Sequence, residues 1–368
     1  MRVLQVDAGR EWRGGQNQVR LLTRELARSP GIDLKLVTKR GSELAERATA
    51  ASVFVLTVPW RIGLDPRAWW FLRRFIRACR PNIVHVHDSH ALALVRAALL
   101  RPTWRSPMRR WRHRQTSPRQ YEDWSPPVVV AHRRVDFHVR ARSNWFCANR
   151  IVAVSDAVKL VLIADGVLPR DITVIRDGVD PEEVRANARA VLDVRAQLRL
   201  ASGTPLAVNV AALVPHKDQR TLIRAAAHAR PIRPDLHWVI AGAGELRHTL
   251  EREIAHQQVG DRVHLVGYIP EADALIRESD VFVMSSKEEG LGSVILHALA
   301  LGKPVVATAA GGIPEVLPTE CLVPVGDAEA LAQKVVRSLD HPSPFPLPAT
   351  LTAKSMAQAT LALYHSLV

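Results

Sequence analysis

Short apolar runs that alternate with helical patterns constrain the fold of this chain more than any other feature of its sequence. Runs typical of buried strands occur at 3–7, 34–37, 83–87, 128–131 and 151–154. The alternation restarts near residue 205, with strand-like runs at 206–212, 238–241, 263–266, 281–284 and 304–307. Strands that alternate with helices favour parallel sheets built from βαβ units. The sequence therefore predicts an α/β protein made of two consecutive units of similar size.

The length of the chain agrees with two units. Its 368 residues exceed the roughly 250–300 residues beyond which a single core stops growing. We predict an N-terminal domain over 1–185, a C-terminal domain over 186–345 and a C-terminal helix within 346–368. This helix follows the proline-rich stretch 341–349, and we expect it to cross back to the N-terminal domain.

Composition argues against several classes of protein. No apolar run approaches the ~18 residues that a membrane-spanning helix needs. The first residues carry one arginine and then only a strand-length apolar run, so we expect no secretory signal and a cytoplasmic location. Cys79, Cys147 and Cys321 are widely spaced and form no CxxC pair, which argues against a disulfide framework or a structural zinc site.

The balance of charge is strongly basic. Lysine and arginine number 50 against 36 aspartates and glutamates, which gives a formal net charge of +14. Such a charge favours nucleic acid, anionic lipid or phosphorylated small molecules as partners, although an arginine-rich composition also follows from a GC-rich genome.

The segment 101–126 concentrates this charge, because it interleaves arginines with Trp104, Trp111 and Trp124. It is the best candidate for peripheral contact with an anionic membrane, at the inner face of the cell membrane. The alternative is a solvated, disordered loop. The segment matches no nucleic-acid-binding module, so we predict no nucleic acid partner; steep salt dependence of duplex binding would revive that class.

Two glycine-containing loops each follow a predicted strand and precede a predicted helix, at 242–244 and 289–294. Glycine lets the backbone approach a ligand closely, and the start of a helix favours phosphate. Glu289 offers a carboxylate that can accept hydrogen bonds from sugar hydroxyls. Lys217 follows another strand, at the edge where open α/β sheets bind ligands, and supplies a charge for a diphosphate. Each feature alone is also typical of an ordinary turn or a solvated lysine.

The ordered set of motifs resembles the retaining family-4 glycosyltransferases of the GT-B fold over nearly the whole chain. The matching pieces are Gly14-Gly15-Gln16, 81–88, 128–132, 151–157, 174–180, Lys217, 242–244, Gly267, 289–292, 302–307 and 311–315. The resemblance implies two Rossmann-like domains that face a cleft. It implies that the N-terminal domain binds the acceptor and the C-terminal domain binds a nucleotide-sugar donor.

The resemblance also implies a reaction. A retaining transferase would move a hexose-like sugar from a nucleotide-diphosphate donor to a hydroxyl, with the leaving diphosphate helping to deprotonate the acceptor. No cofactor and no metal ion are expected besides this donor. The acceptor would be a saccharide of a cell-surface glycan, such as lipopolysaccharide or capsule, or a lipid-linked saccharide.

The resemblance assigns roles to individual residues. Lys217 resembles the donor-diphosphate lysine, Glu289 the glutamate that contacts the transferred sugar, and His132 the histidine near the reacting sugar; these three are the catalytic candidates. The donor-binding candidates are Gly14, Gly15, Lys217, Gly242, Gly267, Tyr268, Glu289, Gly290, Leu291, Gly292, Ser293, Val294 and His297. The acceptor-binding candidates are Asp88, Arg133 and Arg134, where the two arginines are suited to an anionic acceptor or form a basic rim without a specific partner.

Three positions depart from the family pattern, and the smallest change is Asp177, where the family commonly has an asparagine. His297 stands where the family has a second glutamate that holds the ribose, and a neutral imidazole offers one acceptor nitrogen where a carboxylate can serve two hydroxyls. Ala212 stands where an arginine often accompanies the diphosphate lysine, so a bidentate phosphate clamp is missing. These departures leave two alternatives open: a nucleotide-sugar epimerase or hydrolase on the same fold, and a catalytically weakened scaffold protein of a glycan pathway.

The histidines His85, His87 and His90 lie close together in the sequence beside Asp88. His85 and His87 alternate along one predicted strand and His90 lies beyond it, so we expect no complete set of metal ligands to converge. We expect one buried, hydrogen-bonded histidine and others that line the cleft.

Overall fold

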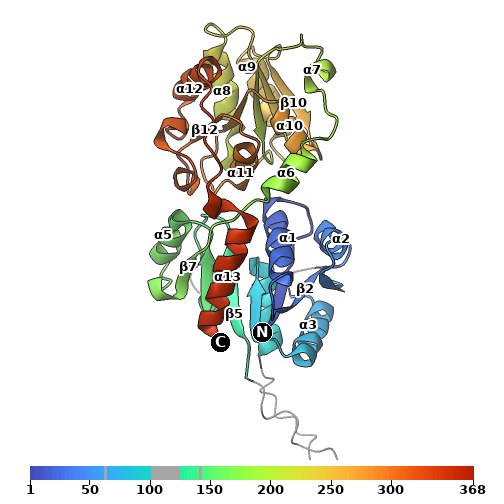
Figure 1. The fold of residues 1–368 in the computed structure, drawn as a ribbon. Helices are drawn as coiled ribbons and strands as arrows, with labels where there is room; N and C mark the ends of the chain where they lie inside the picture. Colours follow the sequence, from blue (N-terminus) through green and yellow to red (C-terminus); the bar gives the residue numbers. More distant parts are fainter. Residues whose placement is uncertain (62–63, 101–124, 141–142) are drawn as a thin grey trace, which may run out of the picture.

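Two parallel sheets organise the computed structural model, which describes residues 1–61, 64–100, 125–140 and 143–368 (Figure 1). Most of the arginine- and tryptophan-rich segment predicted at 101–126 lies outside these residues. Within the described residues, no helix is long and apolar enough to cross a membrane.

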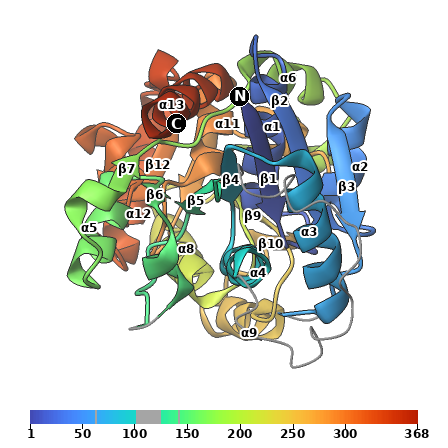
Figure 2. The same ribbon diagram turned by 90° about the horizontal axis from the view of Figure 1, so that it is seen from below.

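The first half holds a sheet whose strands follow the order β3-β2-β1-β4-β5-β6-β7, all parallel. Its strands are β1 Arg2–Asp7, β2 Asp33–Lys39, β3 Phe54–Val58, β4 Ile83–Val86, β5 Val128–Arg133, β6 Arg150–Ala153 and β7 Ile172–Val174. Its helices are α1 Gly14–Ala27, α2 Glu43–Ala50, α3 Pro66–Cys79, α4 Ser89–Leu99 and α5 Asp156–Ala164. Helices cover both faces of this sheet (Figure 2), which explains why strand side chains such as Val3, Leu4 and Val6 are almost fully buried.

The second half repeats this plan with the strand order β10-β9-β8-β11-β12-β13. Its strands are β8 Leu206–Val210, β9 His237–Ala241, β10 Val263–Gly267, β11 Val281–Met284, β12 Val305–Thr308 and β13 Leu322–Val323. Its helices are α8 Gln219–Ala229, α9 Arg247–His256, α10 Ala272–Glu278, α11 Ser293–Ala300 and α12 Ala328–Asp340. The predicted α/β architecture of two Rossmann-like halves is confirmed.

Three further α-helices are α6 Pro181–Asn187, α7 Val194–Gln197 and α13 Ala353–Leu367. Helix α6 lies at the junction of the halves, α7 lies beside the second sheet, where Val194 packs in one apolar cluster with Leu206 and Val208, and α13 lies along the first half (Figure 1). The chain returns from the second half beside the linker, where Val179 bridges Thr352 and the Ala353 N–H donates to the Val179 carbonyl at 2.8 Å. Gly178 has no room for a side chain there, since a Cβ would lie 2.2 Å from the Thr352 backbone. Helix α13 then runs along α1 of the first half (Figure 1).

The strand order places the ligand-binding edge of each sheet. In the first sheet β1 has β2 on one side and β4 on the other, and in the second β8 lies between β9 and β11. At β1 and at β8 the chain changes from building one side of the sheet to building the other. Open α/β sheets bind ligands in the crevice beyond the carboxyl ends of the strands at such a point. The loops after β1, β8 and β11 contain Gly14, Lys217 and Glu289.

Candidate active site

A cavity of about 540 Å³ lies between the two halves. The first half and the linker contribute Trp12, Arg20 and Glu183, while the second half contributes Tyr268, Asp273, Val294 and His297, among others. Tyr268 is 61% exposed at its rim. Three donor-binding candidates therefore line one cavity: Tyr268, from the loop after β10, and Val294 and His297, both from α11.

Two helix starts face each other beside this cavity. Gly14 begins α1, and Ser293 begins α11 after Gly292, whose φ of +80° is left-handed. A Cβ on Gly14 would lie 3.3 Å from the Ser293 hydroxyl oxygen, so the two starts are in close contact. Neither helix has an acidic residue in its first turn. The first N–H groups of a helix lack partners within it, and its start carries the positive end of the dipole, so two helix starts in contact make this a position that favours an anion.

Lys217 and Glu289 form an ion pair next to this position. The Lys217 Nζ contacts Glu289 Oε2, and both side chains are largely buried, 18% and 13% exposed. The Glu289 N–H donates to Asp136 Oδ2 at 2.8 Å, which links the loop of the second half to the segment after β5 in the first. Sequence reasoning did not find Asp136, because nothing in its local sequence distinguishes it from other loop aspartates.

Gly290 serves a contact within the protein. A Cβ on Gly290 would lie 2.1 Å from the Arg134 carbonyl oxygen, so the backbones of the two halves touch here. Gly311, in the following loop, is equally tight, with 1.9 Å from its Cβ position to the Glu289 carbonyl. The loop 289–292 is therefore clamped between 134–136 and 311–312, which fixes the start of α11 against the first half.

The glycines of the Gly242–Gly244 loop are also required by contacts within the protein. Cβ atoms there would lie 1.8 Å from the Ala211 carbonyl and 2.3 Å from the Leu213 carbonyl. These glycines thus let the loop after β9 pack onto the loop that leads to Lys217. Gly267, with φ of +79°, ends β10 and turns the chain so that Tyr268 reaches the cavity.

His297 has an acidic partner that the sequence did not indicate. Its Nδ1 lies 2.7 Å from Asp273 Oδ1, and Asn187 donates to the other Asp273 oxygen at 3.1 Å. Asp273 lies on α10 and is almost fully buried at the cavity wall. The position that departs from the family pattern is therefore a histidine–carboxylate pair, in which the carboxylate is supplied by a neighbouring helix.

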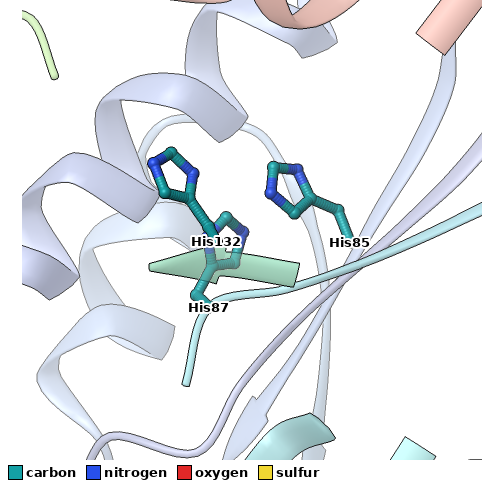
Figure 3. Close-up of side chains that lie close together, drawn as sticks. All are labelled: His85, His87 and His132. Carbon is teal, nitrogen blue, oxygen red and sulfur yellow. The ribbon is translucent and has the colours of Figure 1, made fainter. Parts of the chain in front are cut away.

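Three histidines of the first half converge, in contrast to the expectation from sequence (Figure 3). His85, His87 and His132 are 0%, 8% and 1% exposed, and each offers a ring nitrogen within 4.8 Å of the others. His90 is exposed and lies outside this group. The expectation that no set of histidines converges was wrong, because β4 and β5 are neighbours, with His85 opposite Val130 and Val86 opposite Ala131, which brings His132 alongside His87. Pairing between distant strands is invisible in local spacing.

Arg134 determines how these histidines are protonated. Its Nη1 lies 3.2 Å from His87 Nδ1 and its Nη2 lies 3.1 Å from His132 Nδ1. A guanidinium only donates, so both Nδ1 atoms accept and both protons sit on Nε2. Burial, reinforced by the Arg134 charge, lowers the pKa of His87 and of His132 well below the usual value.

The same geometry bears on metal binding. His87 uses its Nε2–H toward Gln5 Oε1 at 3.2 Å, and His85 Nδ1 pairs with the Tyr364 hydroxyl at 2.6 Å. A metal needs lone pairs where His87 and His132 carry protons, and it would have to displace a guanidinium that is ion-paired with Asp177 at 3.0 Å. The three histidines fit a neutral hydrogen-bonded network better than a metal centre, and the absence of a metal stays a prediction.

The acceptor-binding candidates differ in how free their side chains are. Arg134 is directed inward and is neutralised by Asp177. Arg133 stacks over the Trp145 ring at 5.1 Å and donates to the Phe137 carbonyl. Asp88 caps α4 through the His90 and Ala91 N–H groups and also accepts from the Ala8 N–H at 2.7 Å. All three have protein partners, so acceptor contact would add to these roles.

Asp7, at the end of β1, is a further titratable group at this edge. It is buried beside Asp88, and burial together with the Asp88 charge raises its pKa to about 6. The sequence shows that Asp7 ends a strand two residues before Gly9, but only the structure shows the burial that raises its pKa. Strongly shifted carboxylates at a ligand-binding edge are candidates for proton transfer.

Comparison with known proteins agrees with this geometry. The family described as "Glycosyltransferase Family 4" matches residues 12–183, and "Glycosyl transferases group 1" matches residues 192–355. The two matches run through both halves. The chain belongs to glycosyltransferase family 4.

Individual relatives are more distant. The chain is 30% identical over 216 residues to 2-deoxystreptamine glucosyltransferase of Streptomyces kanamyceticus. The matched stretch covers 56% of this chain and 56% of the relative. It is 33% identical over 170 residues to the lipopolysaccharide core biosynthesis glycosyltransferase LpsE of Rhizobium meliloti, 45% of this chain and 47% of LpsE. It thus spans about half the length of the curated relatives it matches.

The fold is shared over the whole chain with solved structures. The Anabaena protein Alr3699/HepE, in a crystal structure with UDP and glucose, superposes with a TM-score of 0.72 over 100% of this chain and 97% of that one. At 18% identity this likeness shows the GT-B fold alone.

Proposed function

We propose that this glycosyltransferase moves a hexose-like sugar from a nucleoside-diphosphate donor to a hydroxyl of a saccharide acceptor. The observation that carries the proposal is the contact between the helix starts at Gly14 and Ser293, which have no acidic residue in their first turns and lie next to the Lys217–Glu289 ion pair. A diphosphate bridging the halves would receive N–H groups from both helices and the ammonium of Lys217. The nucleoside would extend into the cavity lined by Tyr268 and His297.

In the proposed reaction, the bond from the sugar carbon to the diphosphate oxygen breaks and a bond to the acceptor oxygen forms on the same face. The acceptor proton passes to the leaving diphosphate. Charge grows on that diphosphate, and the helix starts and Lys217 are already oriented to stabilise it. In this proposal the fixed cations replace a metal ion, and configuration at the sugar carbon is retained.

Glu289 and His132 would act on the sugar itself. In the free protein Glu289 is paired with Lys217. When the donor binds, Lys217 would contact the diphosphate and Glu289 the sugar hydroxyls, so the ion pair has to separate. His132 keeps its proton on Nε2 through Arg134, which makes that nitrogen a hydrogen-bond donor. The His297–Asp273 pair would hold the ribose: the His297 Nδ1–H donates to Asp273 Oδ1, which leaves Nε2 as an acceptor for a ribose hydroxyl.

The acceptor is proposed to be a cell-surface glycan or its lipid-linked precursor. The name of LpsE supports this class, while the name of the Streptomyces relative indicates a small aminocyclitol. The proposal places the reaction in the cytoplasm, at the inner face of the membrane when the acceptor is lipid-linked. Transfer of labelled sugar to a lipid extract, compared with transfer to an aminocyclitol, distinguishes the two classes.

Thermal unfolding with UDP, GDP and ADP, and with CMP as control, tests the donor site in the presence of a chelator. A ligand at 100-fold its dissociation constant stabilises the folded state by roughly 2.7 kcal/mol, so one diphosphate should shift the melting curve clearly. The shift should be lost in Lys217→Ala and kept in Lys354→Ala, an exposed lysine on α13.

The outcomes separate the alternatives. No shift with any diphosphate would contradict the donor site and favour a scaffold protein, as the changes at Ala212 and His297 would then have disabled the cavity. A shift accompanied by release or rearrangement of the sugar without any acceptor would favour a hydrolase or epimerase. Transfer only in the presence of an acceptor supports the proposal.

A further inference from the structure

The inner and outer faces of helix α3 carry side chains with different roles. Its sequence PRAWWFLRRFIRAC contains no acidic residue, and Asp65 before it caps the first turn. On the inner face Ala68, Leu72 and Ile76 are buried in the core. Two polar groups of the inner side hold the end of α4.

The contacts with α4 account for one tryptophan and one arginine of this helix. The Trp69 indole N–H donates to the Ala97 carbonyl at 3.0 Å. Arg73 is buried and donates to the carbonyls of Ala98 and Leu100. These bonds satisfy carbonyls that the end of a helix leaves unpaired. Fold stability therefore explains Trp69 and Arg73.

Fold stability does not explain the residues on the outer face of α3. Trp70 and Phe71 are 52% and 40% exposed, and Arg67, Arg74 and Arg77 are exposed on the same side, at helical spacing. Arg74 lies over the Trp70 ring at 5.8 Å. Among the described residues, no carboxylate forms an ion pair with any of these three arginines.

Apolar groups from neighbouring segments extend this face. Phe54, 54% exposed on the edge strand β3, stacks on Phe75 of α3 with ring centroids 6.2 Å apart. Leu64, just before α3, and Leu100, just after α4, are about three-fifths exposed. In Figure 1, α3 lies at the end of the first half that is remote from the second half.

We propose that this surface, which we call the α3 surface (Trp70, Phe71, Arg67, Arg74 and Arg77), docks on an anionic lipid bilayer. Tryptophan and phenylalanine beside arginines are the composition of helices that lie in a membrane interface, with rings at the headgroup level and guanidinium groups on phosphates. Arginines that have no ion-pair partner in the described part of the chain, around exposed aromatic rings, match a surface that is anionic and has an accessible apolar layer. A second copy of this chain would bring like charges together, which disfavours self-association through the α3 surface.

Docking through the α3 surface goes beyond the proposed transfer reaction, and its test needs neither donor nor acceptor. The full chain is sedimented with vesicles of phosphatidylglycerol mixed with phosphatidylcholine, and with vesicles of phosphatidylcholine alone. Binding is expected to the anionic vesicles and to weaken as salt is added. Removing basic residues near such a surface costs about fivefold in affinity for each, so Arg67→Gln, Arg74→Gln and Arg77→Gln together should reduce binding on the order of 100-fold.

Matched variants keep the test specific. Arg189→Gln, Arg252→Gln and Arg337→Gln remove the same charge from exposed positions elsewhere and should leave binding within about twofold, since they lie on or next to α6, α9 and α12, away from α3 (Figure 1). Trp70→Ser with Phe71→Ser should weaken binding without changing its salt dependence, because apolar burial is lost and the charges remain. Unchanged melting temperatures would show that each variant is folded.

Several results would overturn the proposal. Equal binding by the arginine variant and its matched control would show that docking uses another surface. Equal binding to neutral vesicles would exclude charge recognition. A dimer in light scattering that becomes a monomer in the Trp70→Ser, Phe71→Ser variant would assign the α3 surface to a protein interface, and duplex DNA that competes fully with the vesicles would assign it to nucleic acid.

Discussion

At the scale of single residues, charge and tautomer at the cleft depend on contacts from distant parts of the chain. Glu289 meets Lys217 and Asp136, and His132 is oriented by Arg134. The sequence named Lys217 and Glu289 as site candidates, because charged residues after strands are a local signal and both match the family pattern. It noted Asp177 only as a departure from that pattern and did not single out Asp136 or Asp273, because the contacts of these residues are made with distant parts of the chain.

We predict that Glu289→Gln reduces sugar transfer on the order of 100-fold or more while nucleoside-diphosphate binding persists. The amide keeps the shape but loses the charge that is paired with Lys217 and set against the reacting sugar. Initial rates and thermal shifts with the diphosphate measure the two effects. Glu288→Gln, an exposed neighbour, is the control, and wild-type rates in Glu289→Gln would contradict the assignment.

We predict a pH-dependent effect of His85→Asn on stability. Burial lowers the pKa of His85 from 6.5 to about 3, so the folded form stays neutral while the unfolded chain takes up a proton below pH 6.5. The unfolded state then binds more protons, and the wild type loses stability as pH falls from 6.5 toward 3.

The unfolded His85→Asn variant cannot take up a proton at position 85. The stability difference between wild type and variant should therefore shrink as the pH falls from 6 to 4, by about 1.4 kcal/mol per pH unit. Urea unfolding at three pH values measures it. His365→Asn, at an exposed position on α13, serves as control. A constant difference across this range would show that His85 titrates normally in the folded protein.

At the scale of elements, the loops determine where helices begin. The sequence placed glycines before α11 and at the start of α1, but it assigned Gly290 and Gly242 to ligand contact. The structure shows that backbone contacts also require glycine at both positions, with 2.1 Å and 1.8 Å from the respective Cβ positions to the nearest backbone atom. A glycine required by a ligand and one required by another backbone look identical in sequence.

We predict that Gly290→Ala lowers the free energy of unfolding by about 1–3 kcal/mol, since the methyl group displaces the Arg134 carbonyl. Nucleotide affinity should fall as well, because the start of α11 moves away from Gly14. Gly260→Ala is the matched control: its Cβ would lie 3.8 Å from the nearest atom, at a φ that alanine adopts freely. Equal stability of the two variants would refute the clamp.

At the scale of the whole molecule, the halves are joined by polar bridges as well as by α13. Glu315 of the second half accepts from the N–H groups of Asp156 and Ala157 at the start of α5 and pairs with Arg176. Arg20 and Arg24 of α1 pair with Asp180 and Glu183 of the linker. These contacts set the width of the cleft in which donor and acceptor would meet.

We predict that Glu315→Ala loosens this junction. It leaves the start of α5 without its carboxylate and should lower the free energy of unfolding by about 1–2 kcal/mol, allowing for its partial exposure. Hydrogen exchange should accelerate at 155–158 and 313–317 and remain unchanged in β9. Glu320→Ala, an exposed position nearby, should have no such effect, and unchanged exchange in both variants would contradict the bridge.

The sequence by itself determined the two α/β halves, the family and the positions of the main site loops. Hydrophobic periodicity and residue type at strand ends are local properties, and burial of apolar surface enforces them wherever the chain packs. Only the tertiary structure decided that His132 joins His85 and His87, that Asp273 supports His297 and that Arg134 is neutralised within the protein. These contacts arise from parallel strand pairing and from the packing of two halves, which join residues far apart in the chain, and the cost of burying an unpaired charge selects which of them persist.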